Sequence, residues 1–158
     1  MARDHRKLRV FHDSHRLALA IYRETKAFPK DEWFGIRQQV RRAAISVPTN
    51  IVEGSARLTT REYINFVNVA RGSAGELQYL IGLCCELGFL SSDVFKGLND
   101  KADHVVRQLQ RLLQELDILL AMEREAKKQS VKIGNGERKR ARKPRAQSRE
   151  PLSVSQTP

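Results

Sequence analysis

The apolar residues of this chain fall into four stripes with helical spacing. The stripe in residues 36–57 advances in steps of three and four, which places its members on one face of an α-helix. It consists of Ile36, Val40, Ala43, Ala44, Val47 and Ile51. Similar stripes run through residues 13–26, 60–87 and 92–128. Because short links join the four segments, the pattern predicts an all-α fold, an antiparallel up-down four-helix bundle over residues 13–128.

The fourth stripe is the most regular, because its steps of three and four alternate as in a heptad seam. Its members are Phe95, Leu98, Ala102, Val105, Leu109, Leu112, Leu116 and Leu119. The inner face of the first helix should comprise Leu17, Ala18, Ile21, Tyr22 and Thr25. Two apolar residues of the second segment, Phe34 and Ile45, lie partly off its stripe. These two side chains would be exposed to water unless another surface buries them, which favours self-association of the chain.

Capping residues mark the expected helix ends. Thr59 and Glu62 have the spacing of a capping box at the start of the third helix. Asp13 or Ser14 can cap the first helix, Ser91 or Ser92 the fourth, and Gly54 offers a stop for the second.

Proline and glycine interrupt two of the expected helices. Pro48 predicts a kink or break near residues 44–48, where Ser46 is placed to bond a freed carbonyl. The third helix contains Gly72, Gly75 and Gly82. Either a neighbouring helix approaches closely at these glycines, or packing tolerates them.

Most of the net charge of +11 lies at the two ends of the 158-residue chain. The arm 1–12 carries +3 and residues 13–128 carry +2. Residues 129–158 hold eight Lys or Arg and two Glu, a net of +6, with few large apolar side chains. That composition predicts a disordered basic tail. The arm either folds back on the bundle through Leu8, Val10 and Phe11 or frays.

Composition bounds the class of protein. Hydrophobic residues make up 41% of the chain, enough for a core, and the pI near 10.2 suggests a polyanionic partner. The N-terminus is polar, and no apolar run approaches the roughly 20 residues of a membrane span. Neighbouring Cys84 and Cys85 point apart on a helix, so two reduced thiols are expected. We therefore expect a cytoplasmic protein that does not bind membranes.

Catalytic and metal signals are weak. His12 and His15 share a helical face, but no cluster of further ligands lies near them, so we expect no metal and no cofactor. Possible nucleophiles are Cys84, Ser46 and Ser73, and none has a histidine at a recognisable motif spacing. We expect no catalytic residues.

Basic residues are the strongest candidates for function. On the expected bundle they are Arg37, Arg41, Arg42, Arg57, Arg61, Arg107 and Arg111. In the tail they are Arg138, Lys139, Arg140, Arg142, Lys143 and Arg145. The residues of the bundle form either a phosphate-binding surface or a solvated face. The run in the tail contains no aromatic residue, so it predicts phosphate contact without base stacking.

Three motifs carry a family resemblance. FPKDEWFG, QQVRRAAISVPTNIVEG and VARGSAGEL resemble the four-helix bundle family encoded by intervening sequences of bacterial 23S rRNA genes, over roughly residues 8–120. A related branch is the accessory variability protein of diversity-generating retroelements, which is associated with a reverse transcriptase. The resemblance implies homopentameric barrels with a basic surface. It also marks Glu53 and Arg71, which form either a polar ligand site or, as we favour, an ion pair fixing helix register.

Together these features predict a non-enzymatic, cytoplasmic, homo-oligomeric bundle that binds RNA or DNA electrostatically. The first alternative is a protein-binding adaptor, for example of a reverse transcriptase. The second is an enzyme.

Overall fold

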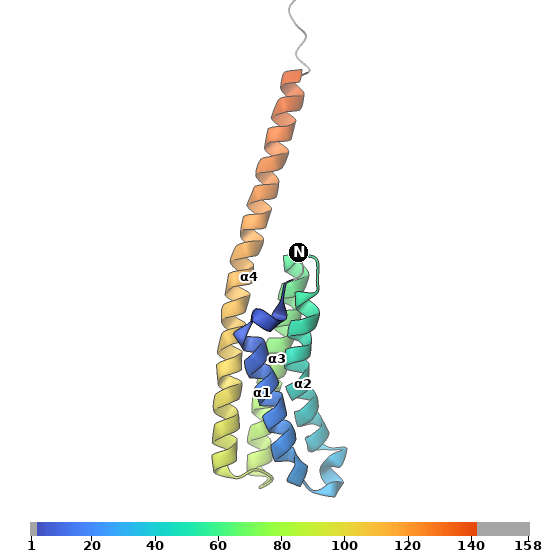
Figure 1. The fold of residues 1–158 in the computed structure, drawn as a ribbon, viewed down its shortest axis with the longest axis vertical. Helices are drawn as coiled ribbons and strands as arrows, with labels where there is room; N and C mark the ends of the chain where they lie inside the picture. The colour runs from blue at the N-terminus through green and yellow to red at the C-terminus, as the bar shows by residue number, and fades with distance from the viewer. Residues whose placement is uncertain (1–2, 142–158) are drawn as a thin grey trace, which may run out of the picture. The chain divides into compact units, whose positions relative to one another are not determined.

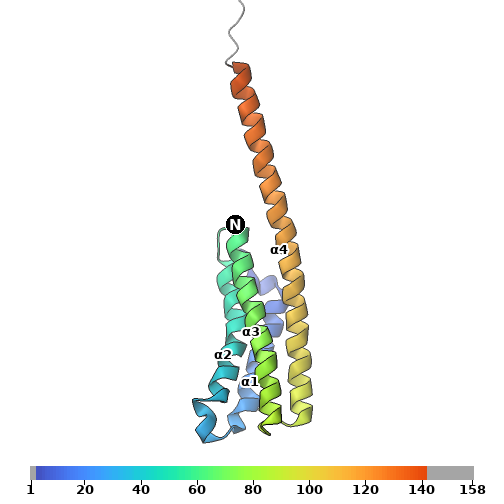
Figure 2. The same cartoon turned by 180° about the vertical axis from the view of Figure 1, so that it is seen from behind.

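Four α-helices make up most of the part of the chain that the structure describes. The computed structural model describes residues 3–141, with side chains for residues 3–130 other than Trp33. The helices are α1 (Arg9–Glu24), α2 (Ile36–Ser55), α3 (Thr60–Glu86) and α4 (Ser92–Ala141), and short 3-10 turns cover His5–Lys7, Thr25–Ala27 and Lys30–Trp33. Residues 3–141 contain no strand, and consecutive helices run in opposite directions (Figures 1 and 2). The predicted antiparallel four-helix bundle is confirmed.

Helix α4 continues further than the sequence pattern indicated. The chain divides into two compact units, Met1–Ala121 and Met122–Pro158. The bundle belongs to the first, and α4 extends through the second as far as Ala141. The expected helix end near residue 128 is thus wrong: α4 continues through Gly134 and Gly136, although glycine has a low helix propensity. The rest of the predicted tail, 142–158, lies outside the described residues.

The core follows the predicted stripes. Every member of the α2 stripe is buried except half-buried Ile36. Of the five residues predicted for the inner face of the first helix, only Tyr22 is exposed. On α4 the seam is buried from Leu98 to Leu109, after which Leu113 joins it and Leu119 is 39% exposed. A straight helix drifts by about 20° per heptad, which explains why the buried row leaves the strict seam.

The N-terminal arm folds onto the bundle. Helix α1 begins at Arg9, so neither Asp13 nor Ser14 is its cap; Leu8 occupies that position. Val10 is buried, and the Arg3 backbone N–H donates to the Ser55 carbonyl at 3.2 Å. The Arg3 side chain donates to Thr60 Oγ1 at 2.6 Å. These contacts attach the arm to the turn between α2 and α3.

The capping predictions for the later helices are confirmed. Thr59 and Glu62 form the capping box of α3. The Val94 backbone N–H donates to Ser91 Oγ at 3.4 Å at the start of α4.

Helix α2 passes through Pro48 without a break. Pro48 is buried within a continuous helix, and nearby side chains supply hydrogen bonds. Thr49 Oγ1 donates to the Ile45 carbonyl at 2.9 Å, and Asn50 Nδ2 donates to the Ser46 carbonyl at 2.8 Å. The Ser46 hydroxyl instead lies 2.8 Å from the Ser73 hydroxyl on α3. Helix α2 therefore accommodates Pro48 close to the hydrogen bond between Ser46 and Ser73 that joins it to α3.

A glycine permits the close approach of these two helices, but it is not one of those in α3. A Cβ on Gly54 would lie 2.7 Å from Tyr63 Cδ2 and 2.8 Å from Phe66 Cβ. A Cβ on Gly72 or Gly75 would meet nothing within 4 Å. Gly54 therefore serves packing, and α2 ends one residue later, at Ser55.

Replacement of these glycines separates packing from helix propensity. Gly54→Ala should destabilise the bundle by about 1–2 kcal/mol, because overpacking outweighs the gain of about 1 kcal/mol in propensity. The matched control, Gly72→Ala, should stabilise by about 0.5–1 kcal/mol. Urea unfolding at one protein concentration measures both. Equal stability of the two variants would show that Tyr63 and Phe66 do not confine Gly54.

Candidate nucleic-acid interface

A groove between α1 and the start of α2 brings together three of the predicted arginines. Its volume is about 650 Å³. We call it the basic groove; it is lined by Tyr22, Phe34, Arg37, Gln38, Arg41, Arg42, Ile45, Ser46, Thr49 and Asn50. The helical spacing of α2 explains the grouping, because Arg37 and Arg41 are four residues apart and Arg42 is adjacent.

Arg41 is held in a fixed position within the groove. Its Nε donates to Thr25 Oγ1 at 2.8 Å and its Nη2 to the Tyr22 carbonyl at 3.3 Å. Its guanidinium also lies 4.7 Å from the centre of the Tyr22 ring. Thr25 is buried and itself donates to the Ile21 carbonyl at 2.8 Å. The end of α1 and the 3-10 turn that follows it thus orient this cation.

The described side chains that line the groove are basic or uncharged. None of the described residues that line it is acidic. Burial, with a further contribution from the charge of Arg37, lowers the pKa of Arg41. The side chain of Arg42 is exposed and makes no hydrogen bond or ion pair with any described residue. An arginine cluster of this kind suits phosphate oxygens, to which guanidinium groups bind bidentately.

Two aromatic side chains line the same groove. Phe34 is 88% exposed. Tyr22 was predicted on the inner face of the first helix, but it is 37% exposed, so that prediction is wrong. The sequence pattern did show that Phe34 lies off the apolar stripe. It could not show that Tyr22 lies beside the same arginines, because that depends on the packing of α1 against α2.

The other predicted basic residues of the bundle lie outside the groove. Arg57 stacks on Phe66, with its guanidinium 4.5 Å from the ring centre, and Arg61 is exposed at the start of α3. On α4, Arg107 pairs with Asp103, one turn away, whereas Arg111 is exposed. Neutralisation by Asp103 weakens the second patch as an anion site.

The basic run of the tail is only partly described. Arg138, Lys139 and Arg140 belong to α4, but their side chains are not described. Arg142, Lys143 and Arg145 lie outside the described residues.

The predicted ion pair between Glu53 and Arg71 does not form. Both side chains are exposed, and they do not approach within the 4.0 Å of a salt bridge. Contact between α2 and α3 at this level comes instead from Gly54 and Tyr63, so packing rather than charge fixes the register.

The candidate nucleophiles have unsuitable surroundings. Cys84 is buried, which raises the pKa of its thiol to about 11, whereas a nucleophilic cysteine needs a lowered pKa. Ser46 and Ser73 bond to each other, and Asn50 Nδ2 donates to Ser46 Oγ at 3.1 Å.

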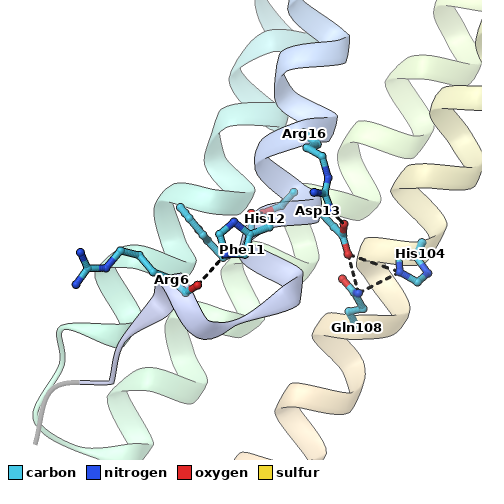
Figure 3. A network of polar contacts seen from close by, with 8 residues as sticks. Arg6, Phe11, His12, Asp13, Arg16, His104 and Gln108 are labelled. Atoms are coloured by element: carbon cyan, nitrogen blue, oxygen red, sulfur yellow. Dashed lines mark hydrogen bonds and ion pairs between the residues drawn. The ribbon is translucent and has the colours of Figure 1, made fainter.

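The histidines of α1 do not converge on a site. His12 Nε2 bonds the Arg6 carbonyl at 2.7 Å, away from the contact between α1 and α4 (Figure 3). At that contact Gln108 Nε2 donates to Asp13 Oδ2 at 2.8 Å, and His104 Nε2 lies 3.7 Å from the same oxygen. The described residues contain no group of three or more His, Cys, Asp or Glu that could hold a metal ion.

An apolar groove adjoins the basic groove. It is lined by Phe11, His15, Ala18, Leu19, Tyr22, Ile45, Pro48, Thr49 and Val52. Leu19, Ile45 and Val52 are exposed, so this face of α1 and α2 presents apolar surface to solvent. Across the described residues, none of the helices has the length and apolar character of a membrane span.

Comparison with known proteins agrees with the fold. The family model of the 23S rRNA-intervening sequence protein matches residues 6–111. The chain belongs to this family. A crystal structure from Bacteroides thetaiotaomicron VPI-5482, described as a protein of unknown function from the S23 ribosomal protein family, has a similar fold. The TM-score is 0.62 at 21% identity, over 66% of this chain and 97% of that one. No curated protein matches the chain.

The contact of Asp13 with α4 predicts a pH-dependent contribution to stability. Burial opposes ionisation, but hydrogen bonds from Arg16 and Gln108 lower the pKa of Asp13 below 3.8. The stabilisation is therefore complete above the unfolded value of 3.8 and is lost as the pH falls through the lower folded value. Asp13→Asn should cost about 1 kcal/mol at pH 7.

Thermal unfolding from pH 7 to pH 2.5 measures this contribution. The difference between wild type and Asp13→Asn should shrink below about pH 4. Asp100→Asn is the control, because that carboxylate is exposed and has no described hydrogen bond. A constant difference across the range would refute the assignment.

Proposed function

We propose that this family member is a non-enzymatic protein that binds RNA or DNA through the basic groove. The observation that carries the proposal is a groove lined by three arginines and, among the described residues, by no carboxylate. Such a site attracts a polyanion and gains free energy from the counterions that the nucleic acid releases. The chain charge of +11 adds long-range attraction.

The proposed mechanism is phosphate contact rather than recognition of base sequence. Arg41 is held by Thr25 and by the Tyr22 carbonyl, so its charge has a defined position. Arg42, which is exposed, is placed to follow the backbone. The basic residues between 129 and 158 supply further phosphate contacts in this proposal.

We also propose that copies of the chain self-associate, most favourably as a pentamer given the family resemblance. The support from the structure is the apolar groove, where Leu19 is 49% exposed beside Ile45 and Val52. Burial of such surface is worth about 25 cal/mol per Å². A ring would repeat the basic groove and so strengthen a site that is weak in one copy.

The adaptor hypothesis uses the same apolar groove for a different protein. A reverse transcriptase is the partner that the resemblance to retroelement accessory proteins suggests. In that case nucleic-acid contact would be secondary, and binding to generic nucleic acid would be weak. We also propose a cytoplasmic location, with no cofactor and no membrane partner.

Replacement of the three groove arginines tests nucleic-acid binding. The variant Arg37→Ala/Arg41→Ala/Arg42→Ala should weaken binding to unrelated RNA and DNA alike. If each arginine contacts a phosphate, the slope of log affinity against log salt should fall by about 2–3. Fluorescence anisotropy across a salt series measures both quantities.

The control is a charge-matched variant on α4, Arg107→Ala/Arg111→Ala/Arg124→Ala. Deletion of residues 129–158 measures the contribution of the tail to binding. If both triple variants lose the same affinity, binding depends on the overall charge of the chain and the groove has no special role. If neither the triple variants nor the deletion alters binding, electrostatic nucleic-acid binding is wrong and the adaptor hypothesis leads.

A charge in the apolar groove tests self-association. Wild type should scatter light as an oligomer, near five times the chain mass of 18.1 kDa for a pentamer. Leu19→Glu should shift it toward one copy, because an unpaired carboxylate would be buried at the contact. Leu58→Glu is the matched control, since Leu58 is 93% exposed and lies outside the groove. A wild-type mass near 18.1 kDa at every concentration would refute the proposal.

A further inference from the structure

Phe34 is the most exposed aromatic side chain described for this protein, and it lies in the basic groove. It is 88% exposed at the link between the turn Lys30–Trp33 and α2. The Phe34 backbone N–H bonds to the Glu32 carbonyl, and Glu32 Oε2 accepts from the Ile36 backbone N–H at 3.1 Å. The backbone that carries the ring is therefore anchored at the start of α2.

An exposed phenylalanine beside arginines restricts the chemistry of a ligand. Apolar surface in water is unfavourable, so the ring favours a ligand with a flat apolar face. The arginines attract a negatively charged ligand, and no described lining residue is acidic, so none repels such a ligand. Tyr22 adds a second ring, already stacked against Arg41 at 4.7 Å.

Unpaired nucleotides combine these two properties. In a single strand the base presents its π-face next to a phosphate, whereas a duplex stacks its bases away from such a ring. Groups that can accept or donate hydrogen bonds also line the groove, among them Gln38 and Asn50. The volume of about 650 Å³ lies within the range of small-ligand sites, about 300–1,000 Å³.

We infer that the basic groove binds single-stranded nucleic acid, with Phe34 stacked on an unpaired base while Arg37, Arg41 and Arg42 contact the adjacent phosphates. The inference rests on the proposed function and deepens it by naming the form of nucleic acid. It assigns to the bundle a binding mode that the tail lacks, because ERKRARKPR contains no aromatic residue.

Binding of labelled single strands and duplexes tests the inference. The probes are a 20-nucleotide oligo(dT), a 20-nucleotide oligo(U) and a 20-base-pair DNA duplex, measured by anisotropy at one salt concentration. Wild type should bind the single strands more tightly than the duplex. Phe34→Ala should weaken single-strand binding about 5- to 150-fold, the effect of losing one base–aromatic stack. It should leave duplex binding and the salt slope unchanged.

Three comparisons make the outcome decisive. Phe34→Tyr should retain single-strand binding, because it keeps a ring that can stack. Leu58→Ala should have no effect, since Leu58 is an exposed apolar residue outside the groove. The triple arginine variant should weaken single-strand and duplex binding together. Light scattering of Phe34→Ala reports whether its assembly is intact.

Each contrary result has a separate meaning. If wild type binds both forms equally and Phe34→Ala changes neither, the stacking inference is overturned while charge-driven binding survives. If wild type binds neither form, the proposed function itself fails. If Phe34→Ala instead lowers the mass of the assembly, Phe34 belongs to a contact between copies, and the inference is likewise overturned.

Discussion

The close contact of α2 with α3 is the constraint on which the rest of this structure depends. Gly54 allows the backbone of α2 to lie against Tyr63 and Phe66. The hydroxyls of Ser46 and Ser73, 2.8 Å apart, continue the contact between the two helices. A helix pressed against its neighbour along this face cannot rotate without exposing its core. The outer face of α2 is therefore fixed, and it carries the arginines.

The same face shows how packing produces a charged site. Arg37 and Arg41 occupy one row of α2, and beside it lie Tyr22 in the last turn of α1 and Thr25 in the 3-10 turn that follows. Thr25 is buried and bonded to the Ile21 carbonyl, so it offers a hydroxyl in a fixed place. Arg41 is bound by groups that belong to another helix. The positive groove is thus a product of the interface between α1 and α2, with each helix supplying a part.

Much of the fold could be predicted because helical packing leaves a periodic record in the sequence. The stripes of the four helices and the capping box at Thr59 were predicted from spacing, and the cap of α4 was predicted as Ser91 or Ser92, of which Ser91 forms the bond. Errors occurred where the signal is local and weak. Helix α1 has no side-chain cap, and α4 continues to Ala141 through residues whose composition resembles that of a disordered segment. Likewise, the motifs of the family resemblance suggested an ion pair of Glu53 with Arg71, although the sequence carries no information on the distance between them.

By itself, the sequence determined the number and order of the helices, which of their faces are buried, and the basic character of the chain. These properties follow from residue type and spacing along one helix. Only the tertiary structure decided that Gly54 rather than Gly72 is the close contact, and that Tyr22 of α1 joins Phe34 and the three arginines in one groove. Those relations join residues on different helices. They depend on the rotation of each helix and on the distance between helix axes, which periodicity does not record.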